Sequence, residues 1–290
     1  MLWIIPSCLF SLDLELIGGV GNLAFDKTGT SALSLKEGAF TPHYFPLIKA
    51  GISGEYQNLQ YNAGFSRDPF MGNRLSANIK ASFDYFSVGA GPFIGLFNSE
   101  KHPISMGISA MFEVEVPGII FLNAGASSTL GQVMELTGGY SQYSGDISLG
   151  FWVPYVICSL NYSIKNFTQK PEGNLYIEDD SVRYFFRADV FTKNVPYTMR
   201  VDLGFQTLSR SYTSRVISDT DIEMDTEQDV FRLFFVGLEA SYRLNEKLRF
   251  LLGAEFPVYY WGVSPLKSPP KGTVLFETRL GVVWSLTSSE

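Results

Sequence analysis

The sequence is poor in the residues that build disulfide frameworks and metal sites. Its 290 residues include two cysteines, Cys8 and Cys158, and two histidines, His43 and His102. One cysteine lies near the start and the other in mid-chain, so no disulfide framework can be inferred. Two histidines without a cysteine cluster also argue against a transition-metal site. We therefore expect no cofactor and no bound metal.

The sequence also has few charges and no long apolar run. Charged residues make up 18% of the chain, against roughly 25% in soluble domains. The net charge of −7 comes without a basic stripe, so nucleic acid is not an expected partner. No stretch reaches about 18 consecutive apolar residues, which excludes a helical membrane protein.

The most prominent feature of the chain is an alternation of apolar and polar residues with a period of two. In Val274–Leu286, one parity carries Val274, Phe276, Leu280, Val282, Trp284 and Leu286, whereas Glu277, Arg279 and Ser285 occupy the other. Leu248–Tyr260 repeats the pattern, with Glu255 on the polar parity. This period predicts β-strands with one apolar and one polar face. The same alternation occurs in Ile48–Tyr56, Leu59–Ser66, Leu75–Asp84, Ile104–Val114 and Val156–Lys165.

Short and long connections alternate between the predicted strands. Short links fall near Gln57-Asn58, Asp84-Tyr85, Glu115–Gly118, Val153-Pro154, Lys193–Pro196 and Asn245-Glu246. Longer links fall at Asp26–Tyr44, Arg67–Arg74, Asn98–Pro103, Gly131–Gly145, Thr168–Ser181, Ser211–Gln228 and Gly262–Gly272. Six short and seven long links imply 14 strands, and twelve would also fit. The glycines of the first strand, about Leu12–Phe25, predict a bulge.

The alternation fits a transmembrane barrel better than a soluble sandwich, which is the alternative. The apolar parity is nearly free of charge, and its exception, Arg232, lies near a predicted strand end where its side chain can reach the interface. Aromatic residues gather at both ends of the strands, as at the two bilayer interfaces. We predict an all-β fold, a closed antiparallel transmembrane β-barrel with short periplasmic turns and longer extracellular loops.

In such a barrel the charged parity faces the lumen. The predicted lumen-lining residues are Lys49, Glu55, Lys80, Asp84, Glu113, Lys165, Arg183, Arg187, Asp189, Arg200, Asp202, Glu239, Arg249, Glu255, Glu277 and Arg279. The two signs are balanced, so we expect weak ion selectivity and a water-filled interior rather than a hydrophobic cavity. If residue numbers across the Lys193–Pro196 turn sum to 389, Asp189 faces Arg200 and Arg187 faces Asp202.

Two loop features are further candidates for function. Ser211–Gln228 is predicted to be the gate, a cation-attracting loop that carries Asp219, Asp221, Glu223 and Asp225. Its alternating carboxylates could bind Ca²⁺, but the glycine of an EF-hand loop is absent. His43 and His102 fall in predicted external loops, and no spacing of nucleophile, base and acid accompanies them. We therefore expect no enzyme; an outer-membrane hydrolase is the alternative.

The first residues are interpreted as a processing segment. Residues 1–11 are assigned to the remnant of a secretory signal peptide, and residues 12–290 to the barrel domain. Lipidation of Cys8 is an alternative interpretation of the same segment.

From Leu12 to Leu286 the length, strand count and alternation resemble small bacterial outer-membrane porins, OmpG-like in size and architecture. No family-specific motif is present. Phe276–Leu286 resembles the C-terminal assembly signal of such barrels, although it is followed by Thr-Ser-Ser-Glu instead of ending in an aromatic residue. That departure points to an atypical diderm lineage, such as a spirochaete.

The resemblance implies a monomeric channel in the bacterial outer membrane with both termini periplasmic. It implies passive diffusion of small hydrophilic solutes, contact with outer-membrane lipid and insertion by the barrel-assembly machinery. Two alternatives remain. One is a barrel that displays loops for adhesion or surface interaction. The other is a fatty-acid-transporter-like barrel for hydrophobic solutes, although that family carries an N-terminal plug for which there is no room before Leu12.

Overall fold

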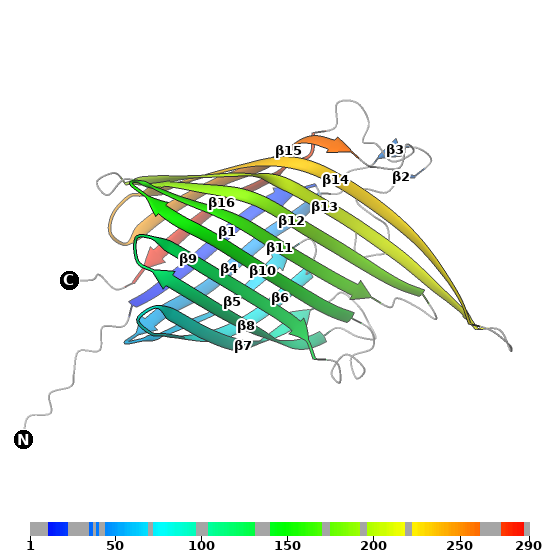
Figure 1. Ribbon diagram of the computed structural model, residues 1–290, viewed down its shortest axis with the longest axis horizontal. Coiled ribbons are helices and arrows are strands. Elements are labelled where there is room, and N and C mark those ends of the chain that lie inside the picture. The colour runs from blue at the N-terminus through cyan, green and yellow to red at the C-terminus, as the bar shows by residue number, and fades with distance from the viewer. Residues whose placement is uncertain are drawn as a thin grey trace, which may run out of the picture.

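In the computed structural model the chain forms a closed antiparallel β-barrel of 14 strands (Figure 1). The structure describes residues 11–22, 35–36, 39–40, 44–68, 72–96, 104–130, 140–169, 175–191, 196–217, 222–261 and 274–286. No helix long and apolar enough to cross a membrane is found in this part of the chain. The predicted fold class and strand number are confirmed.

Each barrel strand pairs with its neighbours along the chain, and β1 closes the barrel against β16. The barrel strands are β1 (Ser11–Gly21), β4 (Phe45–Tyr56), β5 (Leu59–Asp68), β6 (Gly72–Ser82), β7 (Phe86–Leu96), β8 (Ile104–Val116), β9 (Ile120–Thr129), β10 (Tyr140–Val153), β11 (Val156–Gln169), β12 (Leu175–Phe191), β13 (Tyr197–Ile217), β14 (Ile222–Arg243), β15 (Leu248–Trp261) and β16 (Glu277–Ser285). Between β1 and β4 the short strands β2 (Leu35–Lys36) and β3 (Ala39–Phe40) pair with each other.

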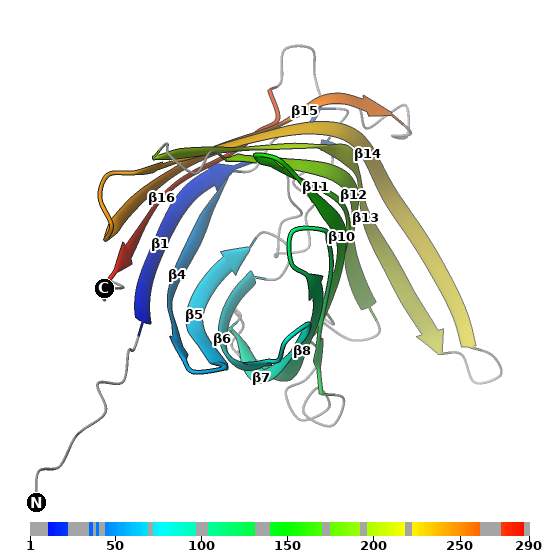
Figure 2. The ribbon, with the colours of Figure 1, turned by 60° about the vertical axis from the view of Figure 1, so that its left-hand side comes forward.

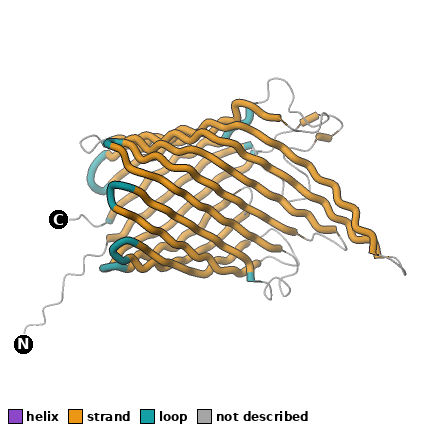
Figure 3. Tube along the Cα trace, in the orientation of Figure 1, coloured by secondary structure: helices purple, strands orange, loops and turns teal. Residues whose placement is uncertain are grey.

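The short connections gather at one end of the barrel, drawn as loops at the left in Figure 3. In two of them Gln57 and Tyr155 adopt left-handed backbone conformations, with φ of 57° and 68°, as tight hairpin turns require. The described ends of the chain lie at the same end, because Ser11 pairs with Glu55 beside the first turn and β16 finishes against the start of β1. An even number of strands makes this arrangement necessary.

The outward face of the barrel is apolar over the length of a membrane span. On β13 the outward residues run from Tyr197 to Phe205, a nine-residue stretch, and about 9–11 residues suffice for a tilted strand to cross a bilayer. Tyr197 pairs with Tyr242 at the turn end of this stretch, and Phe205 pairs with Phe234 at the other end. Water would not cover such a continuous apolar surface, so lipid must.

Polar residues appear on the outward face directly beyond this belt. Thr207 of β13 pairs with Arg232 of β14, and Arg232 is exposed. Arg232 thus lies at the border of the apolar belt, but in the middle of β14 and not near a strand end as predicted. An arginine there can extend its guanidinium into the interface.

The strands are longer at the long-loop end than the sequence predicted. β10 begins at Tyr140, within the predicted loop Gly131–Gly145, and β13 and β14 extend well beyond the other strands (Figure 1). The bulge expected in the first strand is absent from β1, whose register is continuous. The irregularity lies instead between Phe234 and Phe235, where β14 pairs with β15. Gly19 and Gly21 accommodate close neighbours, since a Cβ there would lie 2.1 Å from the carbonyl oxygen of Thr278 and 2.8 Å from the Phe45 ring.

Asn22 extends the seam that closes the barrel. Its side chain is buried, its Nδ2 donates a hydrogen bond to the carbonyl of Val274 at 2.8 Å, and its Oδ1 accepts one from the amide of Phe276 at 2.8 Å. The side chain therefore satisfies one donor and one acceptor of the returning chain before β16 begins.

We expect Asn22→Ala to lower the free energy of unfolding by about 1–3 kcal/mol, because two buried backbone groups lose their partner. Urea titration of the protein in lipid vesicles measures this loss. Asn62→Ala is the matched control, because Asn62 is exposed and binds only another side chain, that of Asn78. Equal losses in the two variants would show that the Asn22 contacts do not stabilise the seam.

Candidate functional site

The structure places the predicted lumen residues on the inward parity of the barrel strands, with one exception. The residues on this parity are Lys49, Glu55, Lys80, Glu113, Lys165, Arg183, Arg187, Asp189, Arg200, Asp202, Glu239, Arg249, Glu255, Glu277 and Arg279. The exception is Asp84, which is exposed in the turn between β6 and β7. Its assignment was wrong because β6 ends at Ser82, two residues before the alternation does.

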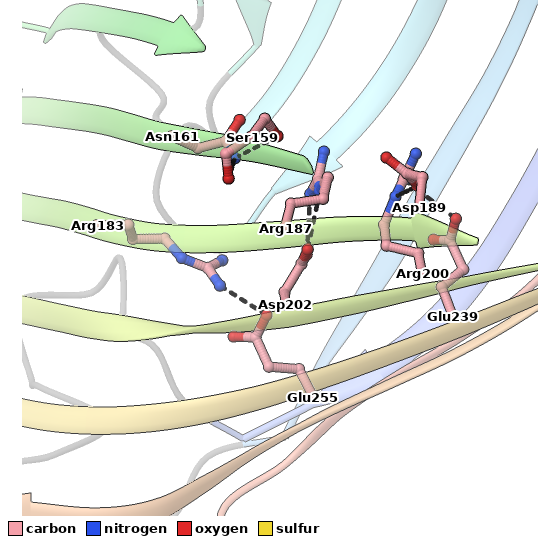
Figure 4. Close-up of polar contacts among 9 residues, drawn as sticks. All are labelled: Ser159, Asn161, Arg183, Arg187, Asp189, Arg200, Asp202, Glu239 and Glu255. Atoms are coloured by element: carbon pink, nitrogen blue, oxygen red, sulfur yellow. Dashed lines mark hydrogen bonds and ion pairs between the residues drawn. The ribbon is translucent and has the colours of Figure 1, made fainter. Parts of the chain in front are cut away.

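The β12–β13 hairpin has the predicted register. Asp189 pairs with Arg200, and Arg187 pairs with Asp202. The Arg187 guanidinium binds both oxygens of Asp202, with Nε–Oδ1 and Nη2–Oδ2 distances of 2.8 and 2.9 Å. Arg200 Nε lies 2.7 Å from Asp189 Oδ1. These cross-strand ion pairs help to fix the register, and Figure 4 shows them side by side on the inner wall.

Further ion pairs continue around this wall. Arg200 also donates to Glu239 on β14 at 3.2 Å. Arg183 on β12 reaches Glu255 on β15 at 2.6 Å, passing over two intervening strands (Figure 4). Gly237 lies beside this contact, and a Cβ there would lie 3.7 Å from Glu255 Oε2 and 3.2 Å from the Asp202 Cβ. At the barrel seam Arg279 Nε donates to Glu277 at 2.7 Å.

The opposite wall carries one more ion pair, and another lies beside the barrel seam. Lys80 on β6 contacts Glu113 on β8 at 2.8 Å, across the strand that carries Gly89. Lys49 on β4 contacts Glu15 on β1 at 2.6 Å. Both walls are therefore lined by paired charges rather than by blocks of one sign.

One ion pair crosses the lumen. Lys165 Nζ on β11 contacts Asp68 Oδ2 at the end of β5, although β6 to β10 lie between these strands in the barrel. Beside it, Arg74 on β6 donates to Ser127 on β9 at 3.0 Å, and its guanidinium lies 3.8 Å from the centroid of the Phe93 ring. Side chains therefore fill the part of the interior that β5 to β11 enclose at this level.

The remaining part of the interior contains a cavity of about 650 Å³. Its described lining residues come from β1, β4, β5 and β11 to β16 and from the segment before β16, and none comes from β6 to β10. It reaches from Thr198 and Arg249 near the turns to Lys165 and Asp68. The cavity therefore lies on one side of the ion pair that crosses the lumen.

The inward face carries apolar side chains at the long-loop end. Phe167, Leu208, Leu233 and Phe235 point inward there and are buried. The alternation of an apolar outward face and a charged inward face, on which the lumen prediction rests, therefore does not extend to this end. The sequence around Phe235 is apolar on both parities, so one apolar set must face the interior while the other faces lipid.

A buried ion pair accompanies this apolar region. Arg210 and Asp179 face each other on β13 and β12, and both side chains are essentially inaccessible to water. Arg210 Nη2 lies 2.6 Å from Asp179 Oδ2, and a second contact joins Nε to Oδ1. Two parallel contacts of this kind are the geometry that compensates a buried guanidinium best.

No family model and no curated protein matches the sequence. Solved structures resemble the fold. An outer-membrane channel from Pseudomonas putida F1 is 8% identical over 95% of this chain and 96% of its own, with a TM-score of 0.50. An anion-selective porin from Comamonas acidovorans is 9% identical over 96% of this chain and 98% of its own, with a TM-score of 0.40. This chain has the outer-membrane β-barrel fold. At these identities the likeness shows the fold alone.

Several charged residues of the barrel interior escaped the sequence prediction. They are Glu15, Asp68, Arg74, Asp146, Asp179 and Arg210. All but Glu15 lie in or beside segments that were predicted to be loops, where no parity was assigned. Glu15 lies in β1, where glycines obscure the alternation. Its position between the apolar residues Leu14 and Leu16 could nevertheless have predicted that it faces inward.

The predicted gate loop is mostly strand. β13 continues to Ile217 and β14 starts at Ile222, so most of Ser211–Gln228 is paired backbone. Glu223 and Asp225 pair with Val216 and Ser214 in this hairpin. Asp219 and Asp221 lie outside the described residues. A two-stranded extension of the barrel wall replaces the flexible loop that the polar composition suggested.

The other candidates from the sequence are the cysteines, the histidines and a metal site. Cys158 is a free cysteine on the outward parity of β11. His43, His102 and residues 1–10 lie outside the described residues. Among the residues that the structure describes, no three histidine, cysteine, aspartate or glutamate side chains are grouped so that they could hold a metal ion.

Proposed function

We propose that this protein is a porin-like channel of the bacterial outer membrane for passive diffusion of small hydrophilic solutes. The observation that supports the proposal is the cavity of about 650 Å³ lined by paired charges, among them Arg183, Arg200, Glu239 and Glu255. Charges in such number are too costly to bury dry, so water fills the space between them. An apolar outer face and a wet, charged inner face are typical of a pore.

The same charges indicate which solutes would pass. Arg183, Arg200 and Arg279 each have a carboxylate partner on the wall, so the net field that acts on an ion is small. A polar solute can exchange hydrogen bonds with these groups and with the water between them. An apolar solute would displace that water without replacing its hydrogen bonds, and its passage would be disfavoured.

The proposal includes an orientation and an environment. The short turns and both described chain ends would face the periplasm, and the extended strand ends would face outward. The barrel would work as a monomer, contact outer-membrane lipid along its apolar face and be inserted by the barrel-assembly machinery.

Reconstitution in planar bilayers tests the proposal. Purified protein is expected to produce stepwise conductance that rises in proportion to salt concentration, because ions would move through water in the lumen. The same preparation unfolded by heat before addition serves as the control for leaks. If folded protein gave no steps over a range of salt concentrations and pH, the channel function would be wrong.

A second function has one observation in its favour. The segment of β13 from Phe205 to Ile217 continues past the apolar belt, and at about 3.3 Å per residue it extends roughly 40 Å. A hairpin of this length could display a surface for adhesion or another surface interaction. Absence of conductance from the folded protein would favour this function over the channel.

A further inference from the structure

We propose that the ion pair between Lys165 and Asp68 sets the size limit of the solute path by holding opposite walls of the barrel together. This inference deepens the proposed channel function and rests on it. The pair joins β11 to β5, and five strands separate these two along the shorter way around the barrel. Salt bridges between neighbouring strands cannot shape a lumen in this way, whereas a contact across it can.

The size of the barrel shows how far the walls must approach. Fourteen strands spaced about 4.8 Å apart and tilted by about 40° would form a round barrel with a diameter of roughly 28 Å. β5 and β11 lie almost diametrically opposite in the strand order. A lysine and an aspartate in contact span at most about 12 Å between their Cα atoms. The backbones at Asp68 and Lys165 are therefore less than half as far apart as in a round barrel.

Both residues lie at the same level of the barrel. Asp68 lies ten residues beyond Asn58 of the β4–β5 turn. Lys165 likewise lies ten residues beyond Tyr155 of the β10–β11 turn. Strands of equal tilt rise equally over ten residues, so the contact runs straight across the lumen. Figure 2 shows the unequal shape that results, with β5 to β8 enclosing a narrow part beside the wider part bounded by β12 to β14.

The narrow part is filled and the wide part is open. Arg74, Ser127 and Phe93 pack against one another in the narrow part at a similar level. The cavity of about 650 Å³ occupies the wide part, and Lys165 and Asp68 belong to its lining. The ion pair thus forms one side of this cavity, and solutes that cross the barrel would pass beside it.

The pair can be removed without unfolding the barrel. Its side chains are 35% and 26% exposed, so the remaining charge stays in contact with water when the other is removed. The strands that carry them remain paired to their neighbours along most of their length. Lys165→Met keeps the bulk of the side chain and removes its charge.

Conductance and solute exclusion test the proposal with Lys247→Met as the control. Lys247 is exposed in the turn between β14 and β15 and does not line the cavity, so its replacement removes the same charge away from the solute path. Lys165→Met is expected to raise single-channel conductance about twofold, as the narrow part joins the path, and to admit larger polyethylene glycols. Lys247→Met should leave both unchanged. If wild type and Lys165→Met conduct equally and exclude the same polymers, the size limit is set elsewhere.

A distance measurement tests the approach of the walls without any conductance. Spin labels at Phe65→Cys on β5 and Ile164→Cys on β11, with Cys8 and Cys158 replaced by alanine, face lipid on opposite walls. Lys165→Met is expected to increase the label separation by up to about 15 Å, and Lys247→Met should not change it. A wild-type separation that matches a round barrel would overturn the inference. A short separation that Lys165→Met releases, in a protein without conductance, would overturn the channel function instead.

Discussion

Replacing Leu160 with arginine is expected to lower the free energy of unfolding in lipid bilayers by about 2–4 kcal/mol, so the variant is less stable. Leu160 points outward from β11, is 65% exposed and pairs with Leu149 and Phe186, which are also exposed and apolar. In water an exposed leucine could be replaced by arginine at little cost. In a bilayer the charge would lie among acyl chains near mid-depth. Urea titration of the variant in phosphatidylcholine vesicles, followed by tryptophan fluorescence, measures the cost.

Asn161→Arg is the control for this experiment. Asn161 is the next residue of the same strand and points into the lumen, where its Nδ2 donates to Ser159. The two variants introduce the same side chain one position apart. A new arginine in the water-filled lumen should cost less than about 1 kcal/mol. Equal costs, or a larger cost at Asn161, would mean that the outward face does not contact lipid and that the barrel is not a membrane protein.

The sequence predicted the membrane-spanning part of this fold well, because lipid and water impose opposite demands on alternate residues. Each strand that crosses the bilayer must keep charge off one parity, and the resulting pattern is visible without any structure. Short turns added enough to predict the register of one hairpin, in which Arg187 meets Asp202. Strand number, strand order and the inward placement of most of the predicted lumen charges follow from these local rules.

Outside the bilayer the alternation of apolar and polar residues is no longer required, because water and not lipid lies on the outward side. Beyond Phe205, β13 continues with Thr207, Ser209 and Ser211 on its outward face, while Leu208 and Arg210 point inward. Water on the outward side tolerates polar residues there, so the apolar parity ends although the strand does not. The polar composition of Ser211–Gln228 is typical of a loop, and for this reason the segment was predicted to be a loop and not two paired strands.

The shape of the lumen could not be predicted from alternation. Parity shows that Lys165 faces inward, but it does not show which residue lies across the barrel from it. Asp68 is 97 positions away in the sequence. Whether Lys165 can reach it depends on how far the cross-section of the barrel departs from a circle. That departure is a property of the whole barrel, to which filled contacts such as that between Arg74 and Ser127 contribute. Local sequence patterns therefore do not predict the shape of the barrel cross-section.

Neutralising two lumen carboxylates is expected to make the channel select anions. In a Glu255→Gln, Glu277→Gln variant, Arg183 and Arg279 would lose their ion-pair partners on the wall of the cavity. The uncompensated guanidinium groups would attract anions and repel cations in a narrow, low-dielectric passage. We expect the chloride-to-potassium permeability ratio to rise by about threefold to tenfold. The reversal potential across a bilayer with a potassium chloride gradient measures this ratio.

The mirror variant, Arg183→Gln with Arg279→Gln, is the control and should shift the reversal potential in the opposite direction. It would leave Glu255 and Glu277 uncompensated at the same places on the wall. General damage to the barrel would change conductance in both variants but could not produce shifts of opposite sign. If both variants kept the wild-type reversal potential while still conducting, ions would not pass along this wall. The charged cavity would then be a structural feature of the barrel and not its solute path.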